Sequence, residues 1–211
     1  MSLKRDLRGP TKRTLEAIET KNKLFCISIK LFSKYGYEAV TIDDITEKAG
    51  VSKGTFYTHF TTKDAVLVEQ FNKIDDAYTK AFENIDGKMS IGEELLLLIE
   101  TMCDYCNSEC GVNVMKIVYM NQIGIAEHPV ILKKHKRPFY TLLEHIVEKG
   151  KKTGEFSKGL NTKNVVMFLA RSAHALIYDW CLYDGNFDLP AEGKRYFSII
   201  IGFLKEGSHS M

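Results

Sequence analysis

Apolar residues recur at helical spacing along most of this chain of 211 residues. They return every three or four positions in successive segments, and most segments end near a Gly or a Pro. No segment alternates apolar and polar residues as a half-buried strand does, and no internal repeat is visible. The pattern therefore predicts an all-α protein of about nine helices.

The predicted helices fall into two groups. An N-terminal group of three occupies residues 1–63, of which residues 1–10 are expected to form a mobile arm. The second group occupies residues 64–206, and residues 207–211 are expected to be a tail. The expected helices cover approximately residues 11–35, 42–49, 53–60, 63–82, 91–108, 112–126, 130–149, 162–183 and 190–205.

Two short helices joined by a tight turn are predicted between Thr41 and Phe60. Thr41 can cap the first helix, and Asp44, three residues later, can close a capping box. Gly50 stands where a helix ends on a residue with positive φ, and Ser52 can cap the second helix. The second helix is short and polar on its outer side, which is typical of helix-turn-helix DNA readers. An ordinary helical hairpin has the same spacing.

Two runs around this hairpin carry a more specific pattern. The first is FSKYGYEAVTIDDI at residues 32–45, and the second is AGVSKGTFYTHF at residues 49–60, followed by Lys63. Over about residues 22–70 the chain resembles the N-terminal signature of the TetR family of bacterial transcriptional regulators, and Gly-Glu-Phe at residues 154–156 is a further mark. The resemblance implies a helix-turn-helix domain followed by a helical domain that binds an effector and forms a homodimer. It also implies a ligand-responsive repressor on a pseudo-palindromic operator.

Charge is distributed unevenly along the chain. The whole chain has a net charge of +2, which alone says little about nucleic acid. Residues 1–63 carry 12 Lys and Arg against 7 Asp and Glu, whereas the remainder carries 17 against 20. The positive end is the end with the predicted helix-turn-helix, as attraction to DNA phosphates requires.

Candidate DNA contacts lie on the second motif helix and at the starts of its neighbours. Lys53 can donate to guanine O6 and N7, and threonine side chains can contact thymine or phosphate. By the resemblance, Tyr57, His59 and Lys63 match positions that contact phosphates. The predicted DNA-binding residues are Thr41, Ser52, Lys53, Gly54, Thr55, Tyr57, Thr58, His59 and Lys63.

A dimer is expected, because one recognition helix buries too little surface to be specific alone. The resemblance places its interface on the last two long helices, where one carries a small apolar stripe and the other bulky apolar residues. The alternative is that these stripes are intramolecular core. The predicted interface residues are Ala170, Ala173, Ile177, Cys181, Tyr196, Ile199, Ile200, Phe203 and Leu204.

The resemblance also implies an effector cavity among the middle helices. Methionine and aromatic side chains there suit an apolar or flat ligand, because Met adapts its shape and aromatic rings supply contact area. The alternative is that each such side chain is ordinary core. The predicted lining residues are Met102, Tyr105, Met115, Tyr119, Met120, Phe139 and Phe168.

Other functions have weaker support in the sequence. Cys103, Cys106 and Cys110 can share one helix face, so a thiol- or metal-responsive regulator is an alternative, as is a helical small-molecule binder without DNA readout. Five cysteines and no signal peptide indicate a reducing cytoplasm. No apolar run approaches the length that crosses a membrane. Neither phosphate-loop, metalloprotease nor hydrolase motifs occur, so no enzyme activity, metal or cofactor is predicted.

Overall fold

The computed structural model describes residues 11–83, 85, 87–123 and 137–206 of the chain. Within these ranges it contains nine α-helices, one π-helical turn and no strand, so the predicted all-α fold is confirmed. The chain divides into two compact units, residues 1–66 and 67–211, with the boundary inside one helix. The predicted arm at 1–10 and the predicted tail at 207–211 lie outside the described residues.

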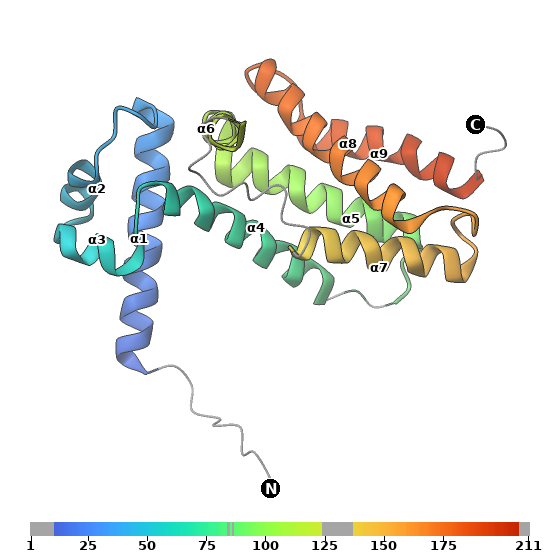
Figure 1. The fold of residues 1–211 in the computed structure, drawn as a ribbon, viewed down its shortest axis with the longest axis horizontal. Coiled ribbons are helices and arrows are strands. Elements are labelled where there is room, and N and C mark those ends of the chain that lie inside the picture. Colours follow the sequence, from blue (N-terminus) through green and yellow to red (C-terminus); the bar gives the residue numbers. More distant parts are fainter. Residues whose placement is uncertain (1–10, 84, 86, 124–136, 207–211) are drawn as a thin grey trace, which may run out of the picture. The chain divides into compact units, whose positions relative to one another are not determined.

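The first unit is a small three-helix domain (Figure 1). It contains α1 (Lys12–Tyr35), α2 (Ile42–Ala49), α3 (Lys53–His59) and the first turn of α4 (Asp64–Glu83). Its core is apolar and closed. The most deeply buried side chains are Leu24, Phe32, Val40, Ile45, Ala49, Phe56 and Phe60.

Local hydrogen bonds begin and end these helices. Thr41 Oγ1 accepts from the backbone N–H of Asp44, and the Asp44 carboxylate accepts from the backbone N–H of Thr41, which completes the capping box. Gly50 ends α2 in the left-handed region with φ 66°, where a side chain would be strained. Ser52 Oγ then accepts from the Thr55 N–H and starts α3. The sharp turn between α2 and α3 is therefore determined by local contacts, each between residues within four positions of one another.

The second unit is a helical bundle (Figure 1). It contains the remainder of α4, then α5 (Ile91–Asp104), the π-helical turn η1 (Tyr105–Cys110), α6 (Gly111–Ile123), α7 (Pro138–Thr153), α8 (Thr162–Leu182) and α9 (Leu189–Glu206). Helix α5 packs against both α7 and α9, and α8 packs against α6, α7 and α9. The fully buried side chains of this core include Leu95, Leu98, Ile99, Leu143, Ile146, Phe156, Leu169 and Phe197.

The end of α7 differs from the prediction of a stop at Gly150. The helix continues through Gly150 to Thr153 and ends at Gly154. Gly150 is instead a packing position, because a Cβ there would lie 2.4 Å from the buried Phe156 ring. Glu155, between them, accepts from the backbone N–H groups of Ile91 and Gly92, at 2.8 and 2.9 Å, and so caps α5.

The start of α7 also differs from the prediction of one helix over residues 130–149. Arg137 is extended, with ψ 149°, and α7 begins at Pro138. Proline disfavours helical backbone at the preceding residue and is favoured at the first position of a helix, which explains why α7 begins here. The rest of the predicted segment, residues 130–136, lies outside the described residues.

Helix α5 is shorter than the predicted 91–108. Its α-helical pattern ends at Asp104, and residues 105–110 form the π-helical turn η1. Single π-turns inside helices are uncommon and occur often near functional sites.

Helix α8 is an exception to the expectation that no segment is long and apolar enough to cross a membrane. By length and composition alone it passes that test, and 56% of its most apolar window is buried within the protein. Its apolar face is the core of the bundle, whereas Arg171 and Asp179 are exposed on the opposite side. We therefore assign α8 as the core helix of this unit.

Candidate DNA-binding surface and effector cavity

Helix α3 presents a polar outer side on a fixed apolar base. Phe56 is fully buried and Phe60 is 2% exposed, whereas Tyr57 is 49% exposed. Thr41, Ser52, Lys53, Gly54 and Thr58 are exposed, and Thr55 and His59 are half-buried. The predicted base-contacting and phosphate-contacting residues of α3 thus share the outer surface of the first unit.

Lys53 has a partner that the sequence did not indicate. Its Nζ lies 2.9 Å from a carboxylate oxygen of Asp43 on α2, and both side chains are exposed. The hydrogen bond to Asp43 raises the pKa of Lys53, which keeps the ammonium charged. A base contact by Lys53 requires that it leave Asp43, an exchange that costs little at an exposed site.

Lys63 makes contacts within its own unit. Its Nζ donates to the backbone carbonyls of Tyr37 and Val40, at 2.7 and 3.1 Å, and lies 4.1 Å from the centre of the Tyr37 ring. Lys63 therefore ties the start of α4 to the loop before α2, besides any contact with phosphate. This role of Lys63 could not be predicted from the sequence, because the contact joins residues more than twenty positions apart.

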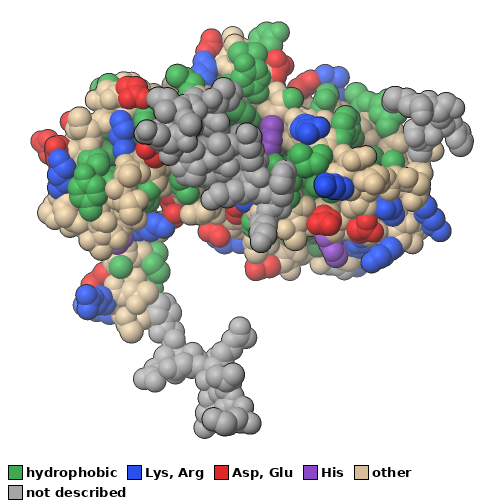
Figure 2. Space-filling model, viewed as in Figure 1, with side chains coloured by type: hydrophobic (Ala, Val, Ile, Leu, Met, Phe, Trp, Pro, Cys, Tyr) green, Lys and Arg blue, Asp and Glu red, His purple; other side chains and the backbone are tan. Residues whose placement is uncertain are grey.

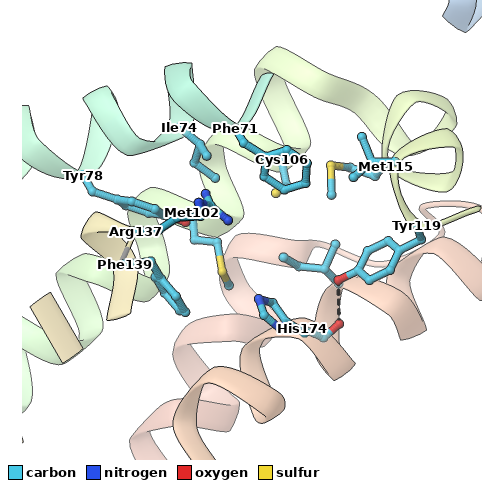
Figure 3. Close-up of a pocket in the computed structure, with 12 residues that line it drawn as sticks. Phe71, Ile74, Tyr78, Met102, Cys106, Met115, Tyr119, Arg137, Phe139 and His174 are labelled. Atoms are coloured by element: carbon cyan, nitrogen blue, oxygen red, sulfur yellow. Dashed lines mark hydrogen bonds between the residues drawn. The ribbon is translucent and has the colours of Figure 1, made fainter. Parts of the chain in front are cut away.

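An apolar cavity lies within the second unit, between α4, α5, α6, α7 and α8 (Figure 3). Its volume is about 40 Å³, enough for a few water molecules and far below the roughly 300–1,000 Å³ of a drug-sized pocket. A larger ligand can enter only if side chains move. The lining residues are Phe71, Ile74, Tyr78, Met102, Cys106, Met115, Val118, Tyr119, Arg137, Phe139, His174 and Ile177.

Four of the seven predicted lining residues reach this cavity, namely Met102, Met115, Tyr119 and Phe139. Met120 and Phe168 do not, because they point outward and are 72% and 53% exposed. Tyr105 is half-buried in η1 and does not line the cavity. Residue type alone did not predict which residues line the cavity, because the orientation of each helix decides which of its side chains point toward the cavity.

Two polar side chains in the cavity wall were missed. Arg137, just before α7, donates from Nε and Nη2 to the two carboxylate oxygens of Asp75 on α4, at 3.0 and 2.9 Å. His174 on α8 is the second, and burial, aided by the charge of Arg137, lowers its pKa to about 4. Its imidazole is therefore neutral at pH 7. His174 could have been singled out from the sequence, because it is a polar residue on a mostly apolar helix face.

The predicted dimer surface needs a correction. The structure buries Ala170, Ala173, Ile177, Cys181, Ile200 and Leu204 within the single chain, so these six residues belong to its own core. Tyr196, Ile199 and Phe203 are exposed, by 39%, 52% and 69%. The small stripe of α8 faces inward because small side chains allow α8 to pack closely on its own neighbours.

Three predicted interface residues and three further apolar side chains are exposed on the last two helices or at the end of α8. Figure 2 shows hydrophobic side chains gathered where α8 turns into α9, at the top of the view. We define the α8–α9 face as Tyr178, Leu182, Tyr183, Tyr196, Ile199 and Phe203, which are 39–69% exposed. Exposed apolar patches of this kind commonly mark protein–protein contacts.

The three clustered cysteines are buried, at the end of α5 and in η1. Burial raises the pKa of Cys103 to about 12, and the hydrogen bond with Cys110, together with burial, raises the pKa of Cys106. Cys103 and Cys106 are thus favoured as thiols rather than thiolates, which makes these two residues poor nucleophiles and poor metal ligands. Across the described ranges no group of three or more His, Cys, Asp or Glu side chains is arranged to hold a metal. The geometry gives the thiol or metal alternative no support.

Comparison with known families and proteins matches both units. Residues 28–69 match the family of bacterial regulatory proteins called tetR, and residues 69–203 match the C-terminal region of YsiA-like proteins. The transcriptional repressor KstR2 of Rhodococcus jostii is 23% identical over 87% of this chain and 90% of its own length. The fatty acid metabolism regulator protein of Bacillus subtilis is 20% identical over 82% of this chain and 90% of its own length.

Solved structures share the fold. FadR from Bacillus halodurans, a fatty acid degradation regulator, superposes with a TM-score of 0.71 at 19% identity, over 88% of this chain and 96% of its own. FadR from Bacillus subtilis, solved in complex with stearoyl-CoA, has a TM-score of 0.69 at 19% identity, over 89% and 99%. The relatives are transcriptional regulators rather than enzymes. The chain belongs to the TetR family of bacterial regulatory proteins and is a ligand-responsive DNA-binding transcriptional regulator.

Proposed function

We propose that this protein is a cytoplasmic repressor that binds a pseudo-palindromic operator as a homodimer and releases it on binding an elongated apolar effector. The observation that carries the proposal is the polar outer side of α3, held on the buried Phe56 and Phe60. Lys53 and Thr55 would read bases, whereas Tyr57, His59 and Lys63 would contact phosphates.

The α8–α9 face supports the homodimer. Five of its six exposed apolar residues lie on the adjacent helices α8 and α9, which in two copies would form a four-helix bundle, and Tyr183 directly follows α8. A dimer would bring two α3 helices to successive major grooves, about 34–36 Å apart. That spacing would supply the specificity that one short helix lacks.

The effector is proposed from the cavity and from the relatives. One relative and one structural neighbour are named as regulators of fatty acid metabolism or degradation. A second structural neighbour was solved in complex with stearoyl-CoA. The cavity wall here is mostly apolar and includes the flexible Met102 and Met115. Because the closed cavity is small, an acyl chain would bind an opened form of the unit and shift the population toward it.

Helix α4 would couple the effector to DNA. Its residues Phe71, Ile74 and Tyr78 line the cavity, and its first turn belongs to the DNA-binding unit. A ligand that displaced these side chains would move α4, and operator affinity would fall if the new position favoured another spacing of the two α3 helices.

The proposal can be tested by footprinting on the DNA adjacent to the gene that encodes this protein. We expect two protected half-sites one helical turn apart and loss of protection when a C12 acyl ligand, either dodecanoate or dodecanoyl-CoA, is added. A protein that binds dodecanoyl-CoA but protects no DNA at low salt would instead be a helical binder without DNA readout.

A further inference from the structure

The wall of the effector cavity contains an ion pair in apolar surroundings. The side chains of Arg137 and Asp75 are only 12% and 15% exposed, and the Arg137 guanidinium lies 4.8 Å from the centre of the Phe71 ring. A buried ion pair contributes little more stability than apolar side chains of the same volume would. Because the pair lies on the cavity wall, it is placed to bind a ligand.

The geometry of the pair suits exchange of one carboxylate for another. Asp75 accepts two parallel hydrogen bonds from the planar guanidinium, at 2.9 and 3.0 Å. This fork binds any carboxylate in the same way, so a ligand carboxylate can take the place of Asp75 without new geometry. Burial of the ligand's hydrocarbon would supply the net driving force.

A second hydrogen-bonding group faces the same space. Figure 3 shows Met102 between the Arg137 guanidinium and the His174 ring. Among the described residues none hydrogen-bonds a ring nitrogen of His174, whose backbone carbonyl accepts from Tyr119. His174 is half-buried, and a neutral imidazole can donate one N–H to a carboxylate oxygen.

We propose that the effector is a carboxylic acid whose carboxylate replaces Asp75 on Arg137 and accepts a hydrogen bond from His174. This inference rests on the proposed function and names the chemical class of its ligand. Its apolar body lies along Phe139, Met102 and Ile74, and its head group lies at the start of α7.

The exchange also explains release of DNA. Asp75 belongs to α4 and Arg137 precedes α7, so the ion pair ties these two elements together. A ligand carboxylate on Arg137 frees Asp75, and α4 loses this tie to α7. A ligand without an acid group fills the cavity but leaves the tie in place.

Three ligands with the same chain separate the possibilities: dodecanoate, dodecanol and dodecanoyl-CoA. Their dissociation constants are measured by calorimetry on the full-length protein, together with release of labelled operator DNA. We expect dodecanoate to bind about tenfold more tightly than dodecanol. In Arg137→Gln this preference disappears while dodecanol binding is retained.

If Arg137→Gln does not fold, Asp75→Asn provides a second test of the carboxylate exchange. Removing the competing carboxylate should strengthen dodecanoate binding and weaken DNA binding without ligand, whereas a purely structural role predicts weaker binding of all three ligands. Glu94→Gln is the matched control, because it breaks another ion pair of this unit, Glu94–Lys149, in which Glu94 is buried. It should leave the ratio of acid to alcohol unchanged.

The outcomes distinguish this inference from the proposed function. Equal binding of acid and alcohol, or a preference for dodecanoyl-CoA that Arg137→Gln does not alter, overturns the carboxylate assignment and leaves an apolar effector standing. Failure of all three ligands to bind overturns both.

Discussion

The two units of this protein place their functional side chains in opposite environments. In the first unit the proposed DNA contacts are exposed or half-buried, lie within one short stretch of sequence, and are carried on a small core. In the second unit the cavity lies between helices, and its wall comes from residues that are up to about a hundred positions apart, such as Phe71 and His174. An exposed polar surface needs only correct helix starts and ends, whereas a cavity needs several helices to pack in one arrangement.

The difference has a consequence for mutation. In the first unit a residue can be removed from the outer surface with little effect on folding, because its side chain contacts mainly solvent. In the second unit the lining residues are also core, so function and stability change together. The following predictions test this separation, from the largest expected effect to the smallest.

Phe56→Ala should remove the fully buried ring beneath α3 and destabilise the first unit by about 3–5 kcal/mol. DNA binding should be lost while the second unit retains ligand binding, which calorimetry and fluorescence anisotropy can measure. Tyr57→Ala is the control, because its ring is half exposed and its loss should weaken DNA binding without unfolding. Loss of ligand binding in Phe56→Ala would contradict the separation of the two units.

Phe203→Glu should place a charge on the α8–α9 face, where Phe203 is 69% exposed in the single chain. If this face forms the dimer, the charge weakens association by about 2–4 kcal/mol, because it is buried without a partner. Sedimentation velocity would then detect monomers. Leu15→Glu, which also replaces an exposed apolar residue, should leave the dimer intact.

Gly150→Ala should destabilise the second unit by about 1–3 kcal/mol, because its Cβ would overlap the Phe156 ring, whose nearest atom lies 2.4 Å away. Thermal unfolding measures the effect. Gly159→Ala is a matched control with no atom within 4 Å of the added Cβ, and it should be nearly neutral. Equal effects of the two substitutions would argue against the close packing of α7 on Phe156.

Lys53→Ala should relax base preference by about 1–2 kcal/mol, whereas Lys63→Ala should weaken binding to all duplexes and reduce the salt slope by about one unit. Anisotropy titrations over a range of salt concentrations separate the two. Lys63→Ala also removes hydrogen bonds to Tyr37 and Val40, so its melting temperature must be compared with that of Lys63→Arg. Salt-independent losses of equal size in both alanine variants would contradict the assigned roles.

The predicted outer surface of α3 depended on the order of residues from Thr41 to Lys63 and on its resemblance to a known family. By contrast, sequence reasoning did not predict which side of α8 is buried in the single chain: Ala170 faces inward and Phe168, two positions earlier, is exposed, and only packing decides between them. It also missed Arg137 and Asp75, which meet across 62 positions.

Local order along the chain thus determined the helices, their caps and the turn before α3, because each depends on residues within about four positions of one another. Only the tertiary structure decided which side chains enclose the cavity, that Arg137 binds Asp75 there, and which apolar residues of α8 and α9 remain exposed. These features depend on contacts between helices distant in sequence, and no periodicity within one helix specifies its neighbours.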